Sequence, residues 1–209
     1  FCPPPSREKY KKDADTGLVE AMFRIGNCYE VGIGTPVNPK EALAVYQRAV
    51  DQKSAAAAYK LAGIYMSGSL APVDHKKAVE YMHVAVDNGH GDAANELGVI
   101  YLQGLVGQKA DSEKAAQMFT KSAELGNGEA MKNIAVMYRS GIGQAPDPAK
   151  ALQWYLIAQR FGFQPENIGQ IINELKKELP PEQVNQSTAE AEKWFSDRQA
   201  KTNPDAAVK

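Results

Sequence analysis

The sequence predicts an all-α fold, a solenoid that repeats one pair of helices along the chain. A tyrosine recurs at intervals of 36 or 37 residues, at Tyr29, Tyr65, Tyr101 and Tyr138. An alanine lies eight residues before each of these tyrosines, at Ala21, Ala57, Ala93 and Ala130. A second alanine recurs with nearly the same period, at Ala42, Ala78, Ala115 and Ala151. Three aligned series of this kind indicate one structural unit that stacks on copies of itself.

The first helix of each unit is predicted from its apolar spacing. In the first unit Met22, Ile25, Gly26 and Tyr29 lie at i, i+3, i+4 and i+7, which places them on one helix face. The later units repeat this spacing with Ala58, Leu61, Ala62, Tyr65, Ala94, Leu97, Gly98, Tyr101, Met131, Ile134, Ala135 and Tyr138. The third position is always glycine or alanine, so we expect a neighbouring helix to approach closely there.

The second helix of each unit is predicted from its boundary residues. A glycine three residues after each tyrosine favours a left-handed turn at the end of the first helix: Gly32, Gly68, Gly104 and Gly141. Good N-cap residues then open the second helix, at Asn38, Asp74, Asp111 and Asp147. Pro39 and Pro148 follow two of these caps, at a position that needs no amide hydrogen. Three units close on a further glycine: Gly89, Gly126 and Gly162.

The same spacing divides the whole chain. We expect an extended segment over 1–5, an N-terminal capping helix over 6–17, repeats over 18–53, 54–89, 90–126 and 127–162, and C-terminal capping helices with a tail over 163–209. The last part leaves the repeat pattern and predicts helices over about 166–178 and 182–200, separated by Pro180 and Pro181. Terminal elements of a solenoid differ from the repeats because they cover the exposed ends of the core.

Composition and motifs exclude several functions. The 24 basic and 25 acidic residues nearly cancel, whereas nucleic-acid binding needs a strongly basic surface. No apolar run reaches the roughly 20 residues that span a bilayer. The histidines lack metal-ligand spacing, and the glycine-rich turns follow helices rather than strands. We therefore expect no catalytic residue, no metal and no cofactor, and a protein as the partner.

The candidate partner site lies on the first helices, which line the concave surface in solenoids of this type. Its residues form the stripe at i, i+3, i+7 and i+10: Phe23, Asn27, Glu30, Tyr59, Met66, Asn95, Val99, Leu102, Lys132 and Arg139. The middle of this set is apolar and its ends are charged, which is typical of a binding patch. We expect Lys132 and Arg139 to meet an acidic group of the partner. The alternative is that Tyr59 and Met66 pack against second helices as part of the core.

The two cysteines, Cys2 and Cys28, form a candidate disulfide. If the helices before and after Gly17 are antiparallel, Cys28 lies beside about residue 6, and the prolines that follow Cys2 can bring it there. Such a bond would close a loop of about 27 residues, contribute about 3–4 kcal/mol and place the protein outside the cytosol. Two free thiols in a cytosolic protein are the alternative.

The repeat resembles the Sel-one-like repeat (SLR) family, which is related to the tetratricopeptide repeat. Repeat four carries the family pattern most completely, with Ala130, Tyr138, Gly141, Gly143, Asp147, Lys150, Ala151, Trp154, Tyr155, Ala158 and Gly162. Repeat two departs from it at Ser69 and Met82. The resemblance implies a right-handed α/α superhelical solenoid with a non-catalytic, protein-binding function.

The resemblance also implies a biological setting. It favours a bacterial cell-envelope adaptor or inhibitor, periplasmic or secreted, such as an immunity protein that neutralises a secreted effector enzyme, for example a phospholipase. A secreted virulence factor that binds a host protein is one alternative. A penicillin-binding, hydrolase-like SLR protein is another, although the sequence contains no serine or histidine cluster of the kind such an enzyme needs.

Overall fold

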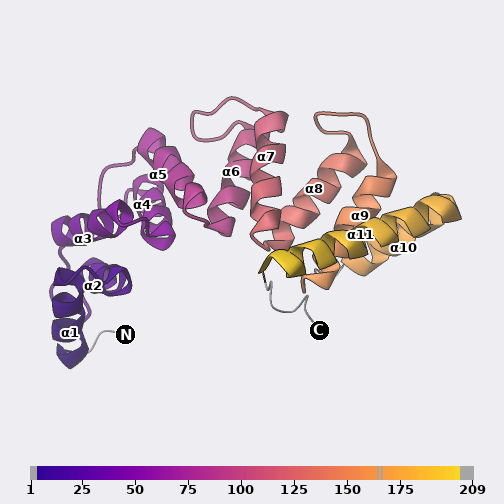
Figure 1. Ribbon diagram of the computed structural model, residues 1–209. Coiled ribbons are helices and arrows are strands. Elements are labelled where there is room, and N and C mark those ends of the chain that lie inside the picture. The colour runs from indigo at the N-terminus through magenta and orange to yellow at the C-terminus, as the bar shows by residue number, and fades with distance from the viewer. Residues whose placement is uncertain (1–3, 164, 166, 203–209) are drawn as a thin grey trace. The chain divides into compact units, whose positions relative to one another are not determined.

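The computed structural model describes residues 4–163, 165 and 167–202, and these residues form α-helices and connecting turns without a strand (Figure 1). The helices are α1 (Pro4–Asp15), α2 (Val19–Val31), α3 (Pro39–Asp51), α4 (Ala55–Ser67), α5 (His75–Asp87), α6 (Gly91–Gln103), α7 (Ser112–Glu124), α8 (Gly128–Ser140), α9 (Pro148–Arg160), α10 (Ile168–Glu178) and α11 (Pro181–Thr202). The all-α solenoid fold is confirmed.

The chain divides into two compact units, Phe1–Leu97 with Val106–Gln108, and Gly98–Leu105 with Lys109–Lys209. The first contains α1 to α5 and the start of α6, and the second contains the rest of α6 and all later helices. In the first unit α2 packs on α3 and α4 packs on α5. In the second unit α8 packs on α9, which also contacts α10 and α11.

The predicted N-caps of the second helices are confirmed. Each cap side chain accepts a hydrogen bond of 2.9 to 3.2 Å from the backbone N–H three residues later, at Asn38, Asp74, Asp111 and Asp147. Pro39 and Pro148 begin α3 and α9. These bonds satisfy amides that lack a partner inside the helix, so four short polar residues fix where the second helices begin.

The second helices end on a left-handed residue, and one unit uses lysine there. Gly89, Gly126 and Gly162 have φ values of 92°, 92° and 79°, while the equivalent Lys53 has a φ of 64°. Glycine adopts this conformation without steric cost, whereas other residues are strained by about 1–2 kcal/mol. Lys53 is therefore the strained member of this series.

Replacing Lys53 by glycine is expected to stabilise the protein by about 0.5–1 kcal/mol, because the relieved strain exceeds the entropy that glycine adds to the unfolded chain. Thermal unfolding measures the change. Gly89→Ala is the matched control, because a Cβ there would meet nothing within 4 Å and only the backbone is strained. It should destabilise the protein by a similar amount. A Lys53→Gly variant that unfolds at a lower temperature would contradict the assignment of strain.

The first and second helices approach each other closely where the first helix carries glycine. A Cβ at Gly26 would lie 2.6 Å from Tyr46 Cε1, and a Cβ at Gly98 would lie 2.5 Å from Phe119 Cδ1. Both rings are fully buried. The predicted close approach is confirmed at these two positions, where an aromatic ring lies directly on the helix backbone.

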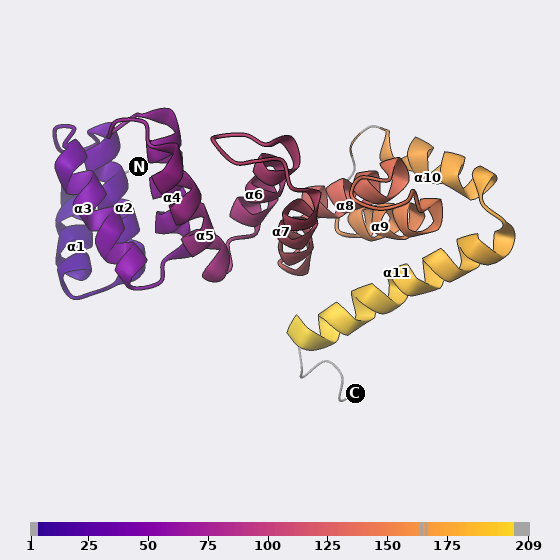
Figure 2. The same cartoon turned by 90° about the horizontal axis from the view of Figure 1, so that it is seen from above.

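Helices outside the four whole repeats lie at both ends of the described array. Helix α1 begins at Pro4, earlier than the expected residue 6, because proline is tolerated in the first helical turn. The rest of the expected extended segment lies outside the described residues. In the second unit α11 turns back from α10 and runs toward the end of α7 (Figure 2). There Arg198 donates hydrogen bonds to the carbonyl oxygens of Ala123 and Glu124.

Helix α11 is fixed to α9 through aromatic and polar contacts. Trp194 lies edge-on against Trp154 and Phe161, with ring centroids 5.6 and 5.7 Å apart. Ser187 is buried and its Oγ donates a 2.9 Å hydrogen bond to the Ala149 carbonyl. These contacts cover the final face of the array, as a terminal cap must.

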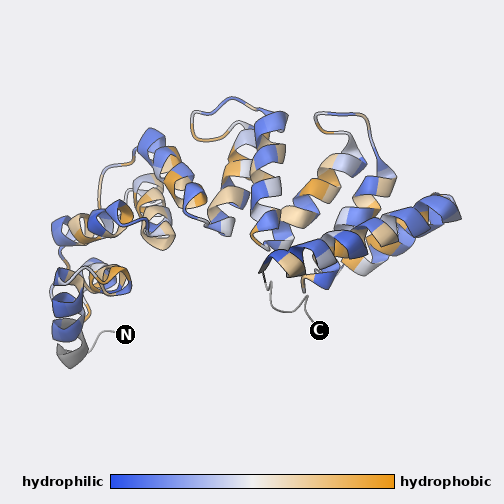
Figure 3. Cartoon of the chain, in the orientation of Figure 1, coloured by the Kyte–Doolittle hydropathy of each residue, from blue (hydrophilic) through white to orange (hydrophobic). Residues whose placement is uncertain are grey.

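Most helices carry a polar face and an apolar face, and α4 is apolar around much of its surface (Figure 3). Its sequence begins with four alanines and continues with Leu61, Ile64 and Met66. In the described part of the chain, no helix has both the length and the apolar character that crossing a membrane requires.

Candidate functional site

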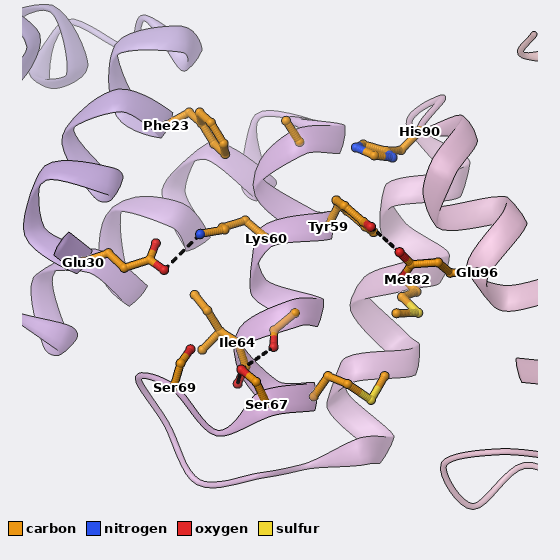
Figure 4. A pocket seen from close by; sticks show the side chains of 13 residues that line it. Phe23, Glu30, Tyr59, Lys60, Ile64, Ser67, Ser69, Met82, His90 and Glu96 are labelled. Atoms are coloured by element: carbon orange, nitrogen blue, oxygen red, sulfur yellow. Dashed lines mark hydrogen bonds and ion pairs between the residues drawn. The ribbon is translucent and has the colours of Figure 1, made fainter. Parts of the chain in front are cut away.

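The first unit contains a pocket of about 580 Å³ beside α4 (Figure 4). Side chains from α2, α4, α5 and α6, and from the connections after α4 and α5, surround it. The lining residues are Phe23, Glu30, Ala56, Tyr59, Lys60, Gly63, Ile64, Met66, Ser67, Ser69, Met82, His90 and Glu96. This volume falls in the range of sites that hold a ligand or a few protein side chains.

The interior of the pocket is mainly apolar. Phe23 on α2, Met66 on α4 and Met82 on α5 contribute flexible or aromatic surface. Gly63 and Ala56 lie on the same helix as Met66 and add little side-chain volume. Thioether side chains adapt to different shapes, so this surface suits an apolar group that inserts from outside.

The rim of the pocket is made of polar groups bonded in pairs. Glu30 Oε1 lies 2.9 Å from Lys60 Nζ, an ion pair between α2 and α4. The Tyr59 hydroxyl donates a short hydrogen bond to Glu96 on α6 (Figure 4). Burial, assisted by Glu96, raises the pKa of Tyr59 well above its ordinary value, so its phenol stays a neutral donor.

His90 links the pocket to the start of α6. Its ring stacks on Tyr59 with centroids 4.3 Å apart and an interplanar angle of 29°. Its Nδ1 accepts a 3.2 Å hydrogen bond from the Ala93 N–H. The side chains of Ser54 and Asn127 accept the equivalent cap bonds at the starts of α4 and α8. His90 therefore serves both as the wall of the pocket and as the cap of α6.

Removing this cap is expected to cost about 1 kcal/mol of stability. His90→Ala removes both the cap and the ring, whereas His90→Asn removes the ring but keeps an acceptor at the cap. The two variants should therefore differ by about 0.5–1 kcal/mol in the free energy of unfolding from denaturant titration, with asparagine the more stable. Equal stability of the two variants would show that the cap contributes little.

Two of the predicted groove residues contact a second helix of their own repeat. The Tyr46 hydroxyl lies 2.7 Å from Glu30 Oε2 and 2.8 Å from Asn27 Oδ1, and it donates its single proton to these acceptors. Burial, together with Glu30, raises the pKa of Tyr46 far above its ordinary value. Asn27 and Glu30 thus satisfy a buried tyrosine hydroxyl, a role that the sequence-based prediction did not assign to them.

The charge of Glu30 and of Arg139, at the two ends of the predicted stripe, follows one pattern. The last stripe position is charged where the second helix supplies a tyrosine, and apolar where it supplies methionine or phenylalanine. The equivalent pairs are Glu30 with Tyr46, Met66 with Met82, Leu102 with Phe119, and Arg139 with Tyr155. Arg139 also lies 3.6 Å from Glu174 and opposes the rise that burial causes in the pKa of Tyr155. The pattern was present in the sequence and would have identified these pairs.

The structure brings Phe23, Glu30, Tyr59 and Met66 together in one pocket, and their role in binding stays a prediction. Asn95 was expected on an open face, but it is only 8% exposed and interacts within the chain. Little of it is open to a partner, and its role in binding stays a prediction.

The remaining predicted residues lie in the second unit. Val99 and Leu102 are half-buried on α6. Lys132 lies 4.0 Å from Glu129 and 5.9 Å from the centre of the Phe163 ring. The two cations expected to meet an acidic partner, Lys132 and Arg139, thus already have acidic neighbours in the chain.

Sequence reasoning missed a second stripe, one residue along from the predicted one. Three of its members reach back to the preceding first helix or cap. Arg24 contacts Tyr10 at 3.5 Å, Lys60 pairs with Glu30, and Glu96 accepts from Tyr59. The recurrence of polar residues at Arg24, Lys60, Glu96 and Asn133 was the available signal. These three contacts connect α2, α4 and α6 each to the element before it.

The predicted disulfide involves one residue outside the described part of the chain. Cys28 lies on α2 and is 2% exposed. Cys2 lies outside the described residues, so its pairing with Cys28 stays a prediction.

Comparison with known proteins gives a family match over most of the chain. A model of the Sel1 repeat matches residues 19–54, 55–90, 91–127 and 128–158. No curated protein matches the sequence at a significant level. The family resemblance inferred from the tyrosine, alanine and glycine series is confirmed.

Several solved structures share the fold. A Sel1 repeat protein from Oxalobacter formigenes is 27% identical, with a TM-score of 0.72 over 91% of this chain and 79% of that one. A protective antigen of uropathogenic Escherichia coli strains that displays an SLR fold is also 27% identical, with a TM-score of 0.73, and the match covers 95% of this chain but only 43% of the antigen. An immunity protein from Pseudomonas aeruginosa is 19% identical with a TM-score of 0.50, over 90% of this chain and 75% of that one, which shows the fold alone.

Proposed function

Because the chain belongs to the Sel1 repeat family, we propose that it is a non-catalytic scaffold that binds another protein through the pocket beside α4. Sel1 repeats mediate protein–protein interaction. The observation that supports this site is its composition, an apolar interior enclosed by bonded polar pairs. Protein interfaces place their energy in such a core and keep their polar groups at the rim.

The polar groups beside the pocket are bonded to one another. Burial raises the pKa values of Tyr59 and Tyr46, so both phenols stay neutral hydrogen-bond donors. Glu30 and Glu96 accept hydrogen bonds from these hydroxyls. Groups tied to one another in this way hold the pocket in a fixed shape, which lowers the entropy cost of binding.

We further propose a bacterial cell-envelope setting, periplasmic or secreted, with a role as adaptor or inhibitor. An immunity protein that neutralises a secreted effector enzyme such as a phospholipase is the specific form that we favour. A bond between Cys2 and Cys28, as the sequence predicts, would require an oxidising compartment. The likeness to the Pseudomonas aeruginosa immunity protein is one of fold and leaves the effector unidentified.

Affinity purification from the native organism tests the scaffold proposal. Tagged wild-type protein should capture a specific protein, and Met66→Asp should lose it because a carboxylate is placed in the apolar interior. Val136→Asp is the control, because Val136 is an exposed apolar residue in the other unit. Thermal unfolding confirms that both variants fold. If folded wild-type protein captures nothing specific, the scaffold proposal is wrong.

Mass spectrometry of the native protein without reductant tests the compartment proposal. We expect Cys2 and Cys28 in one linked peptide pair, and a loss of about 3 kcal/mol in stability after reduction or in Cys2→Ser. Ser196→Ala is the control, because it changes an exposed hydroxyl far along the chain from both cysteines and should leave stability unchanged. Two free thiols in protein isolated under non-reducing conditions would contradict the proposal.

A further inference from the structure

Gly63 lies in the interior of α4, where neither the backbone conformation nor a close neighbour requires glycine. Its φ is not in the left-handed region, and a Cβ placed on it would meet nothing within 4 Å. Gly26 and Gly98 differ, since each lies against a buried aromatic ring. Glycine disfavours the interior of a helix relative to alanine, so α4 carries a cost that no contact of the described chain repays.

The position of Gly63 accounts for the pocket. Tyr59, Gly63 and Met66 lie at i, i+4 and i+7 on the face of α4 that lines it. The equivalent positions in the other repeats carry side chains: Asn27, Val99 and Val136. The missing side chain between Tyr59 and Met66 therefore leaves the helix backbone open to a bulky group from outside.

The charges around the opening are mostly negative. Glu30 and Glu96 line the pocket, and Asp92 lies close enough to act on the ionisation of Tyr59. Lys60 is the lysine among the lining residues, and it pairs with Glu30. An incoming segment therefore meets more carboxylates than ammonium groups, which favours basic side chains beside its apolar group.

We propose that the pocket receives one large apolar side chain, such as leucine, methionine or phenylalanine, from a basic segment of the partner protein. The apolar group would fill the space over Gly63 between Tyr59 and Met66, and a neighbouring arginine or lysine would meet Glu96. This inference rests on the proposed scaffold function and names the chemistry of its partner. Gly63 is then a specificity-determining residue of the interface.

Methionine-methyl NMR with a defined probe tests the inference. The probe is a short synthetic helical peptide with one leucine flanked by arginines, titrated into full-length protein labelled on its six methionines. We expect saturable shifts at Met66 and Met82, which line the pocket, and little change at Met22 and Met131, which are buried outside it. Shifts confined to methionines outside the pocket would overturn the proposal.

Matched peptides separate the apolar and the charged parts of recognition. Replacing the leucine by alanine should weaken binding at least about tenfold, because a buried leucine side chain supplies that much transfer free energy. Replacing the arginines by glutamates should abolish the shifts at Met66 and Met82. Added salt should weaken binding of the arginine peptide. An acidic peptide that binds equally well would refute the charge argument.

Matched variants test the role of Gly63. Gly63→Leu should fold, because its Cβ meets no atom, and it should weaken peptide binding at least about tenfold by filling the pocket from within. Val136→Leu is the control, because it changes the equivalent position in repeat four. Unchanged peptide binding by folded Gly63→Leu would overturn the inference.

The native partner distinguishes this inference from the scaffold proposal. If wild-type protein and Gly63→Leu capture the same partner equally well, the scaffold function stands and the pocket inference is wrong. If wild-type protein captures no partner, the scaffold proposal fails, and the peptide titration alone decides whether the pocket recognises a basic apolar segment.

Discussion

Replacing Gly98 by alanine is expected to destabilise the protein by about 2 kcal/mol, although alanine is the better helix former. The new Cβ would lie 2.5 Å from both Cδ1 and Cε1 of Phe119, whose ring is fully buried. The core around the ring is close-packed, so relieving this contact requires the helix or the ring to be displaced at a cost in packing. Denaturant unfolding measures the loss. The matched control is Gly63→Ala, where a Cβ meets nothing and stability should rise by about 0.5–1 kcal/mol.

A double-mutant cycle identifies the cause of that loss. The equivalent pair in repeat two is Ala62 with Met82, in which a Cβ faces a flexible side chain instead of a ring. Gly98→Ala combined with Phe119→Met should therefore be more stable than the sum of the single changes predicts, by at least about 1 kcal/mol. Additive losses would show that the two positions do not meet in the way described.

Replacing Trp194 by alanine is expected to cost about 2–3 kcal/mol and to act on the second unit. The indole projects from α11 and contacts Trp154 and Phe161 of repeat four edge-on. The chain contains two tryptophans, so in this variant fluorescence reports on Trp154 alone. We expect its thermal transition to move to lower temperature than in wild-type protein.

Lys193→Ala is the control for the tryptophan variant, because Lys193 is an exposed neighbour on the same helix and its loss should change stability by less than about 0.5 kcal/mol. If Trp194→Ala unfolds like Lys193→Ala, then α11 does not stabilise the repeats as the contacts indicate. In a repeat protein each unit contacts only its neighbours, so the fluorescence transition should move more than the overall helical transition.

The sequence predicted the helices well because their boundaries are set by local chemistry. The N-caps at Asn38 and Asp111 bond to amides three residues away, and Gly32 and Gly141 adopt the left-handed conformation that ends a helix. Such signals act within one turn of the chain. They need no knowledge of what packs against the helix, so they could be read before the structure was known.

The pocket could be predicted only in part because it depends on how far each side chain reaches. The predicted stripe includes Phe23, Tyr59 and Met66 but not Lys60 or Glu96, which line the same pocket. Lys60 lies one residue after Tyr59, and Glu96 one residue after the stripe position in the next repeat. Long polar side chains extend past the helix that carries them, and their partners lie 30 to 37 residues away in the sequence. A helical projection of one repeat shows the direction in which each side chain points but not how far it extends.

The polar residues that reach back between repeats make the units non-interchangeable. Lys60 neutralises Glu30, while its counterpart in the next repeat, Glu96, accepts from the Tyr59 hydroxyl. A chain that lost repeat two would place Glu96 where Lys60 now lies and would set two carboxylates against each other. Repeats with similar sequences therefore differ in the charge that each presents to the repeat before it. Loss of repeat two would therefore be opposed by electrostatics at a single pair of positions, Glu30 and Glu96.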